Sequence, residues 1–279
     1  MFVYVYIYLI IAQICGIIKK IGGIIMDLFL DLIFICPLLF LAGIIDGIAG
    51  GGGIIALPAY IMAGLPLNVA YGCNKFQSCI GTSASMFRYA KSGFVDWKAS
   101  FCSVIFAIAG SFISTQIMLS LDDSVKKIII ICAMVFIISL TLLIHRMKSG
   151  TRMKMDTGAG NILLCFGIGL LLGLYDGFFG PGGGTVALML YSLAFGYDVR
   201  VGSGNGKVIV VVSNLIALIN YILHGYVLYA IAIPAAIVNI LGSYIGASLA
   251  VKKGTKLVRK FLIAVVLIVV IQAITKLFT

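Results

Sequence analysis

The stretch Gly43-Ile44-Ile45-Asp46-Gly47-Ile48-Ala49-Gly50-Gly51-Gly52-Gly53 decides how this chain folds. Its pattern, Gly-x-x-Asp-Gly-x-x-Gly, recurs at residues 173–180, where Pro181-Gly182-Gly183-Gly184 follows, so Gly43 matches Gly173 and Asp46 matches Asp176. Each copy places one carboxylate and flexible backbone inside apolar sequence. Such a duplication is typical of secondary transporters built from two related halves, each with an interrupted helix.

The composition around these two copies is that of a membrane protein. Hydrophobic residues make up 62% of the chain and charged residues 10%, with a mean hydropathy of +1.19. A soluble domain is about half apolar and about a quarter charged. The 20 Lys and Arg against 9 Asp do not indicate nucleic-acid binding, because the basic residues form short clusters between apolar runs, as in the loops that orient membrane helices.

Cysteine and histidine do not indicate a metal site or a cofactor. The seven cysteines lie in apolar stretches, their number is odd, and no Cys-x-x-Cys pair occurs, so they are interpreted as small hydrophobic side chains. His145 and His224 stand alone near the ends of apolar segments.

A membrane-spanning helix needs ~20 apolar residues, and several runs in this chain are long enough. Two further runs, 54–64 and 184–195, are too short to span and follow directly on the glycine clusters. Because irregular backbone at membrane depth occurs only inside protein or along a cavity, each short run is predicted to be a half-helix or re-entrant segment. The predicted spans are 29–49, 67–90, 99–119, 128–144, 161–180, 201–223, 226–250 and 261–278.

The duplication continues beyond the glycines after a short insertion in the second copy, so that Lys75 matches Lys207 and Gly110-Ser111 matches Gly242-Ser243. We therefore expect four regions. They are an N-terminal hydrophobic extension (1–25), a first membrane repeat (26–144), a basic cytoplasmic linker (145–160) and a second membrane repeat (161–279).

The distribution of basic residues predicts that the two repeats are inverted relative to each other. If each repeat crosses the membrane an odd number of times, the loops at 88–98, 145–156 and 251–260 share one face, with 12 basic residues against 3 on the other. An even number would nearly erase this bias. The positive-inside rule therefore favours inverted repeats with these loops in the cytoplasm.

Residues 2–18 form another apolar run, which ends at Lys19-Lys20. A signal peptide would carry its positive charge before the apolar run, whereas here the charge follows. The run is either an additional N-terminal anchor or precedes a natural start at Met26, and the second alternative is favoured because the duplicated unit needs nothing before residue 26.

Lys75 and Lys207 lie in apolar surroundings, where a charge costs ~2.5–3.5 kcal/mol, so each is expected to face a cavity or a partner. The favoured interpretation is that both lysines attract an anion. The alternative is that each forms a structural ion pair with Asp46 or Asp176. For these two aspartates, capping of a half-helix is favoured over an ion-pair or coupling role.

The glycine clusters also have two interpretations. Free N–H groups at the starts of the short helices favour an anion near Gly51, Gly52, Gly182 and Gly183. Glycine also lets helices pack closely. Residues 202–207 look like a phosphate-binding loop but lack its first glycine and the Ser or Thr after the lysine, and no nucleophile–base pair is evident, so an enzyme is not expected.

These residues resemble the TauE/SafE family of sulfite and organosulfonate exporters. The resemblance is carried by Asp46 to Gly53 with Pro58, by Asn74-Lys75, by Gly173 to Gly182, and by Lys207 with Ser213-Asn214, and it covers nearly everything from Met26 to Phe278. It implies a multi-helix permease for sulfite, sulfonates or related small anions, with Asn74 and Asn214 beside the lysines. One departure is Val210, where family members often have Asn.

The sequence thus predicts an all-α, multi-pass protein of the cell membrane, a transporter bundle of two inverted repeats with glycine-rich broken or re-entrant helices. Its expected partners are a small anionic substrate and the lipid bilayer, without nucleic acid; self-association into a homo-oligomer stays open. The alternative function is a membrane scaffold or assembly protein that transports nothing and whose intramembrane ion pairs are structural.

Overall fold

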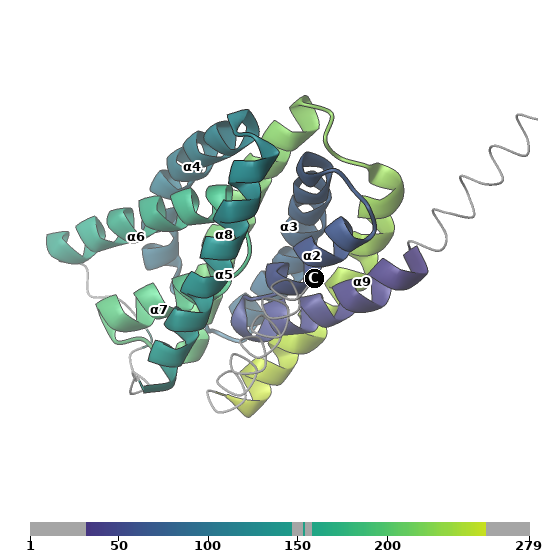
Figure 1. The fold of residues 1–279 in the computed structure, drawn as a ribbon. Helices are drawn as coiled ribbons and strands as arrows, with labels where there is room; N and C mark the ends of the chain where they lie inside the picture. The colour runs from purple at the N-terminus through teal and green to yellow at the C-terminus, as the bar shows by residue number, and fades with distance from the viewer. Residues whose placement is uncertain (1–31, 147–152, 154–157, 255–279) are drawn as a thin grey trace, which may run out of the picture.

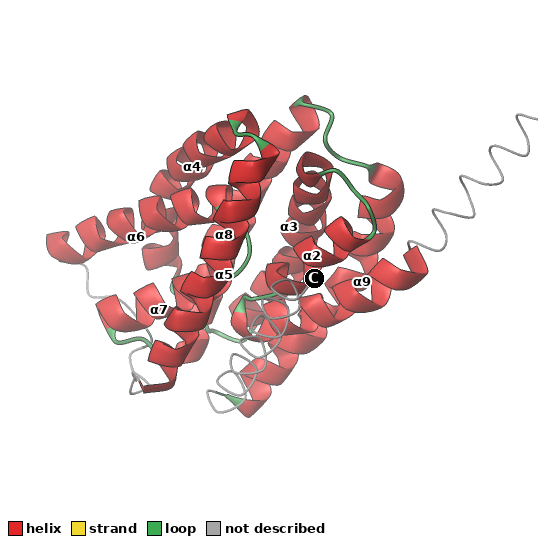
Figure 2. Cartoon of the chain, viewed as in Figure 1, coloured by secondary structure: helices red, strands yellow, loops and turns green. Residues whose placement is uncertain are grey.

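The computed structural model describes residues 32–146, 153 and 158–254. Within these ranges the chain forms nine helices and no strand, which confirms the all-helical prediction (Figure 2). The first helix covers Leu32–Ala49. The others are α2 (Gly53–Met62), α3 (Leu67–Lys91), α4 (Trp97–Ser120), α5 (Asp123–Arg146), α6 (Ala159–Phe178), α7 (Gly183–Phe195), α8 (Val199–Leu223) and α9 (Tyr229–Lys253).

Five of the described helices are long and apolar enough to cross a membrane: the first helix, α4, α6, α8 and α9. The helix α3 has 25 residues, but Lys75, Arg88 and Lys91 make it more polar, and its crossing stays a prediction. The helix α5 begins at Asp123, a few residues before the predicted span at 128–144, and Lys126 in its first turn donates a 2.8 Å hydrogen bond to Asn68. The predicted span 261–278 and the N-terminal extension lie outside the described residues.

The two predicted short helices are present. The helices α2 and α7 contain 10 and 13 residues, and each follows a glycine-rich break in the chain. At these breaks Gly50 has φ of +82° and Gly180 has φ of +71°, a left-handed conformation that costs glycine nothing. The first helix and α6 therefore end at equivalent positions of the duplication, and a short helix begins a few residues later in each half.

Elements of the two predicted halves are interleaved in space. In Figure 1, α4 and α5 lie with α6 and α7, while α9 lies with α2 and α3. The helix α4 packs along α6, and α9 packs along α3. Each group of helices therefore contains long helices from both halves of the sequence, α4 and α5 in one group and α9 in the other.

Small residues make these packings close. A Cβ on Gly43 would lie 2.7 Å from the backbone oxygen of Asn239, and a Cβ on Gly173 would collide with the backbone oxygen of Ala107. These contacts are equivalent, since Gly43 matches Gly173 and Ala107 matches Asn239 in the duplication. The packing role considered for the motif glycines is confirmed at these positions.

The helices α3 and α8, which occupy equivalent places in the duplication, run antiparallel. Near the start of α3, Tyr71 stacks on Tyr221 from the end of α8, with ring centroids 6.3 Å apart. Just after the end of α3, the guanidinium of Arg200 from the start of α8 lies 4.4 Å from the ring centroid of Phe94. The central pair of helices thus crosses the molecule in opposite directions.

Candidate functional site

The two lysines lie on the central helices, Lys75 in the first half of α3 and Lys207 in the first half of α8, and each is 1% exposed. Because α3 and α8 are antiparallel, the two ammonium groups approach the middle of the bundle from opposite ends. Burial of this depth without a partner would be costly, so both charges require compensation.

Each lysine is paired with an aspartate from the other half of the chain. The Nζ atom of Lys75 lies 3.2 Å from Oδ2 of Asp176 and donates a 2.7 Å hydrogen bond to the backbone oxygen of the same residue. The Nζ atom of Lys207 lies 2.9 Å from Oδ2 of Asp46 and also donates to the backbone oxygen of Asp46. The ion pairs of the alternative interpretation therefore exist, and they are exchanged between the halves.

The backbone contacts have a simple electrostatic cause. Asp46 and Asp176 lie in the last turn of the first helix and of α6, where the helix dipole is negative and a carbonyl oxygen can accept a further hydrogen bond. The oxygen of Asp46 also accepts a 2.8 Å bond from the N–H of Gly50. An ammonium group that binds both this carbonyl and the neighbouring carboxylate neutralises two negative centres at once. Each lysine thus holds the C-terminal end of a broken helix.

The favoured prediction for the two aspartates, capping of a half-helix, was wrong. The residue that precedes α2 is Gly52 and the residue that precedes α7 is Gly182, and neither helix start has a side-chain capping bond. The aspartates belong to the helices before the breaks, and their carboxylates face the lysines instead. The motif therefore places its charge on the C-terminal side of one helix rather than on the N-terminal side of the next.

A small polar cavity of about 10 Å³ lies where the breaks meet α3 and α8. A cavity of this size corresponds to about one water molecule, and a sulfur oxyanion is larger. The helix α3 contributes Asn74, Ser78 and Thr82 to its wall. The remaining lining residues are Asp46, Gly50, Gly53, Gly180, Gly182, Gly183, Gly184, Val210 and Asn214.

The structure brings only part of the predicted site to this cavity. Of the predicted residues, the cavity is lined by Asp46, Asn74, Gly182, Gly183 and Asn214, and it is not lined by Lys75, Lys207, Asp176, Gly51 or Gly52. A Cβ on Gly52 would collide with the backbone oxygen of Ala42, so this glycine is needed for packing.

Seven lining residues are missing from the predicted set: the glycines at positions 50, 53, 180 and 184, together with Ser78, Thr82 and Val210. The equivalence of the two breaks was the available signal for Gly50 and Gly180.

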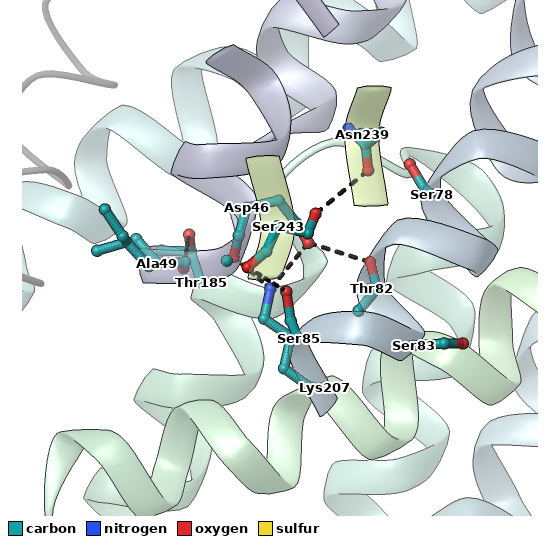
Figure 3. A network of polar contacts seen from close by, with 12 residues as sticks. Asp46, Ala49, Ser78, Thr82, Ser83, Ser85, Thr185, Lys207, Asn239 and Ser243 are labelled. Carbon is teal, nitrogen blue, oxygen red and sulfur yellow. Dashed lines mark hydrogen bonds and ion pairs between the residues drawn. The ribbon is translucent and has the colours of Figure 1, made fainter. Parts of the chain in front are cut away.

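Thr82 and Asn214 support the two ion pairs differently. The hydroxyl of Thr82 donates a 3.0 Å hydrogen bond to Oδ2 of Asp46, so this carboxylate oxygen accepts from both Thr82 and Lys207 (Figure 3). Asn214 instead accepts a 2.9 Å hydrogen bond from Lys75. One half therefore strengthens its carboxylate with a donor, and the other strengthens its ammonium with an acceptor.

The cavity also faces the starts of both short helices. Gly53 is the first residue of α2 and Gly183 is the first residue of α7, and both line the cavity. The N-terminal end of a helix carries a partial positive charge and unpaired N–H groups, which favour an anion. Two such ends, two lysines and two amide side chains therefore surround one small volume in the middle of the helical bundle.

A bundle of apolar helices with broken helices and charged pairs at its centre is the architecture of a multi-pass membrane transporter. The chain belongs to the sulfite exporter TauE/SafE family, whose sequence profile matches residues 35–273.

Relatives agree with this assignment. A probable membrane transporter protein of Haemophilus influenzae is 29% identical over 241 residues, which cover 85% of this chain and 92% of the relative. The probable membrane transporter protein YfcA of Escherichia coli K12 is 27% identical over 248 residues, covering 86% of this chain and 91% of the relative. No solved structure matches this chain.

Proposed function

We propose that this protein moves a small anion across the membrane through the cavity between α3 and α8, and that the anion is a sulfur oxyanion or an organosulfonate. The observation that carries the proposal is the position of the two buried lysines, which flank the point where the N-terminal ends of α2 and α7 meet. The family's description as sulfite exporters supports the sulfur chemistry.

In this proposal Lys75 and Lys207 supply the positive charge that attracts the anion. Asn74 and Asn214 donate amide hydrogen bonds, and the backbone N–H groups at the helix starts, near Gly53, Gly182 and Gly183, complete the shell. Asp46 and Asp176 hold the ammonium groups while the site is empty and release them in part when the anion enters. Val210 leaves one side of the cavity apolar, which suits the organic group of a sulfonate.

The proposed transport cycle uses two inverted halves, 26–144 and 161–279, joined by the linker 145–160. The antiparallel course of the equivalent helices α3 and α8 supports the inversion, and so does the charge bias of 12 against 3. The cavity holds too little volume for the anion as it stands. Its admission therefore requires the two groups of helices to separate on one face and then on the other, as in alternating access.

The competing function is a scaffold whose ion pairs only stabilise the fold. Purified protein in proteoliposomes separates the two, with radiolabelled sulfite, sulfate and methanesulfonate as probes. A transporter gives uptake above that of empty liposomes for at least one probe, and Lys75→Met abolishes most of it. The matched control is Lys91→Met, because Lys91 lies on the same helix but is exposed at its end. A thermal unfolding transition shows whether the purified protein is folded. If folded protein gives no flux with any probe, the proposal is overturned.

A further inference from the structure

Among the described residues, one oxygen of the buried pair Lys75–Asp176 is left without a well-aligned hydrogen bond. Oδ2 of Asp176 lies 3.2 Å from Nζ of Lys75, but Oδ1 forms no well-aligned hydrogen bond within the described residues, although the side chain is only 2% exposed. The hydroxyl of Ser213 lies near this carboxylate and is likewise left without a well-aligned hydrogen bond. A Cβ built on Gly183 would lie 3.0 Å from this Oδ1, and Gly183 lines the cavity. Oδ1 of Asp176 therefore sits beside the cavity wall at the start of α7.

Charge balance gives this oxygen a role in the proposed transport. Two lysines and two aspartates make the cluster neutral before any anion enters. An added anion would leave a net negative charge in a dry interior, where an uncompensated charge costs several kcal/mol. One proton on a carboxylate restores neutrality and turns an acceptor oxygen into a donor.

No other group near Asp176 offers the same compensation. The helix α7 has no charged residue, and α4 has only Lys98, in its first turn. The ionisable groups that interact with Asp176 from neighbouring elements are Lys75 and Cys79 on α3 and Asp46 on the first helix, and Asp46 is itself paired with Lys207 on α8. Both lysines are already paired, and Cys79 would add negative charge by ionising.

Asp46 is less suited to hold the proton than Asp176. Its Oδ2 accepts well-aligned hydrogen bonds from both Lys207 and Thr82, whereas Asp176 accepts one from Lys75 and has only a poorly aligned hydroxyl, that of Ser213, nearby. Donors to a carboxylate stabilise the ionised form. The side chain of Asp46 is also 16% exposed, against 2% for Asp176. The two aspartates therefore occupy equivalent positions, but the surroundings of Asp46 favour the ionised carboxylate more than those of Asp176 do.

We infer that Asp176 takes up one proton on Oδ1 when the anion binds, and that anion and proton cross the membrane together. This inference rests on the proposed function. The proton comes from the aqueous phase, forms an O–H bond at Oδ1 and is released there again when the anion leaves, so that no other bond is made or broken. The neutral carboxyl then donates to the anion, and Lys75 is freed from a full negative charge to bind it.

The test uses proteoliposomes with a pH indicator trapped inside and a gradient of methanesulfonate, sulfate or sulfite. Coupled entry acidifies the lumen in step with the anion. Sulfite itself takes up a proton near neutral pH. With this probe, the number of protons that enter per sulfite is therefore compared between the wild type and Asp176→Asn. Flux of an anion without the corresponding proton would overturn the inference and leave the proposed function standing. No flux of any probe would instead remove the proposed function.

The variant Asp176→Asn imitates the protonated carboxyl. We expect this variant still to exchange labelled for unlabelled anion but no longer to accumulate anion in response to a pH gradient. Its affinity for the anion should change less than about twofold per pH unit. The wild type should bind about tenfold more weakly for each pH unit above the titration of Asp176, since one proton is linked to one anion. Asp122→Asn, the same change at an exposed position, is the control.

A folded Asp176→Asn protein that still accumulates anion from a pH gradient contradicts the inference, and so does one that no longer exchanges anion. If the variant does not fold, the pH dependence of wild-type affinity decides alone, and an affinity independent of pH overturns the inference.

Discussion

Thr82 and Asn214 occupy equivalent positions in the duplication and line the same cavity, yet Thr82 donates to a carboxylate while Asn214 accepts from an ammonium. The cavity is therefore symmetric in its backbone and asymmetric in its side chains. A substrate bound across it meets two lysines whose availability differs, because Lys75 has one acceptor more than Lys207 among these contacts.

The hydrogen bond of Thr82 should be measurable as stability. Thr82→Val keeps the shape of the side chain and removes the donor to Asp46. We expect the free energy of unfolding to fall by about 1 kcal/mol, which lies between the contribution of a hydrogen bond within a membrane and that of a charge-assisted hydrogen bond. Denaturant titration in detergent measures it. Ser83→Ala is the control, since Ser83 bonds only to the backbone of its own helix at Cys79. Equal losses in both variants would show that the Asp46 bond contributes nothing.

Removal of one lysine charge should weaken anion binding. Lys75→Met and Lys207→Met keep the apolar stem and are each expected to lower affinity by ~1.5–3 kcal/mol, about ten- to a hundredfold. Arg at either position should retain more affinity than Met, although its planar group does not replace an ammonium fully. Isothermal titration or a thermal-shift assay with sulfite and methanesulfonate measures this. Well-folded Met variants with unchanged affinity would remove the lysines from the binding site.

The exchange of partners between the halves can be tested by rescue. Lys75→Met alone leaves the carboxylate of Asp176 buried and unpaired, which should cost about 3–5 kcal/mol of stability. Lys75→Met with Asp176→Asn should recover most of this loss, whereas Lys75→Met with Asp46→Asn should not, because Asp46 pairs with Lys207. Thermal unfolding of the four proteins ranks them. Equal rescue by both asparagines would contradict the pairing.

Two glycines on α6 give a matched test of close helix packing. A Cβ on Gly169 would collide with the backbone oxygen of Ser103 on α4, whereas a Cβ on Gly167 meets nothing within 4 Å. Gly169→Ala should therefore destabilise the protein by about 1–3 kcal/mol. Gly167→Ala should be neutral or stabilising by up to about 1 kcal/mol through helix propensity. Similar unfolding free energies for both variants would show that α4 and α6 are not packed as described.

The orientation in the membrane can be read from cysteine labelling. Lys91→Cys and Lys253→Cys lie at the ends of α3 and α9, which Arg88 joins through a 2.9 Å hydrogen bond to Ser248. Both should be protected from a membrane-impermeant maleimide in intact cells, and Asp122→Cys should react. All three positions are exposed in the structure. Reaction of Lys91→Cys and Lys253→Cys from opposite sides would reject the inverted arrangement.

The sequence was informative about local breaks and about burial. Glycines with an aspartate in apolar surroundings indicate an interrupted helix, and the helices that follow begin at Gly53 and Gly183, one residue before the predicted starts. The burial of Lys75 and Lys207 followed from the same apolar context. Local pattern decides these features, because they depend on neighbours in the chain.

Long-range pairing could not be read in the same way. Lys75 and Asp176 are 101 residues apart and Lys207 and Asp46 are 161 apart, and nothing in either sequence segment states which carboxylate each lysine meets. The capping prediction failed for a related reason, since an aspartate beside a glycine cluster can belong to the helix before or after the break. Only the packing of α3 and α8 against both broken helices decides between these alternatives.

The exchanged pairs constrain how such a chain could have arisen. In the first half alone, Asp46 and Lys75 are not partners, so a single unduplicated unit would carry two unmatched charges into the lipid. Two copies of one unit, inserted in opposite orientations, would satisfy all four charges at once. If the two halves are inverted as proposed, an ancestor of half this length would satisfy its charges only as a homodimer of dual topology, and gene fusion would fix that arrangement. Fusion would also allow the two copies to differ, as Thr82 and Asn214 do.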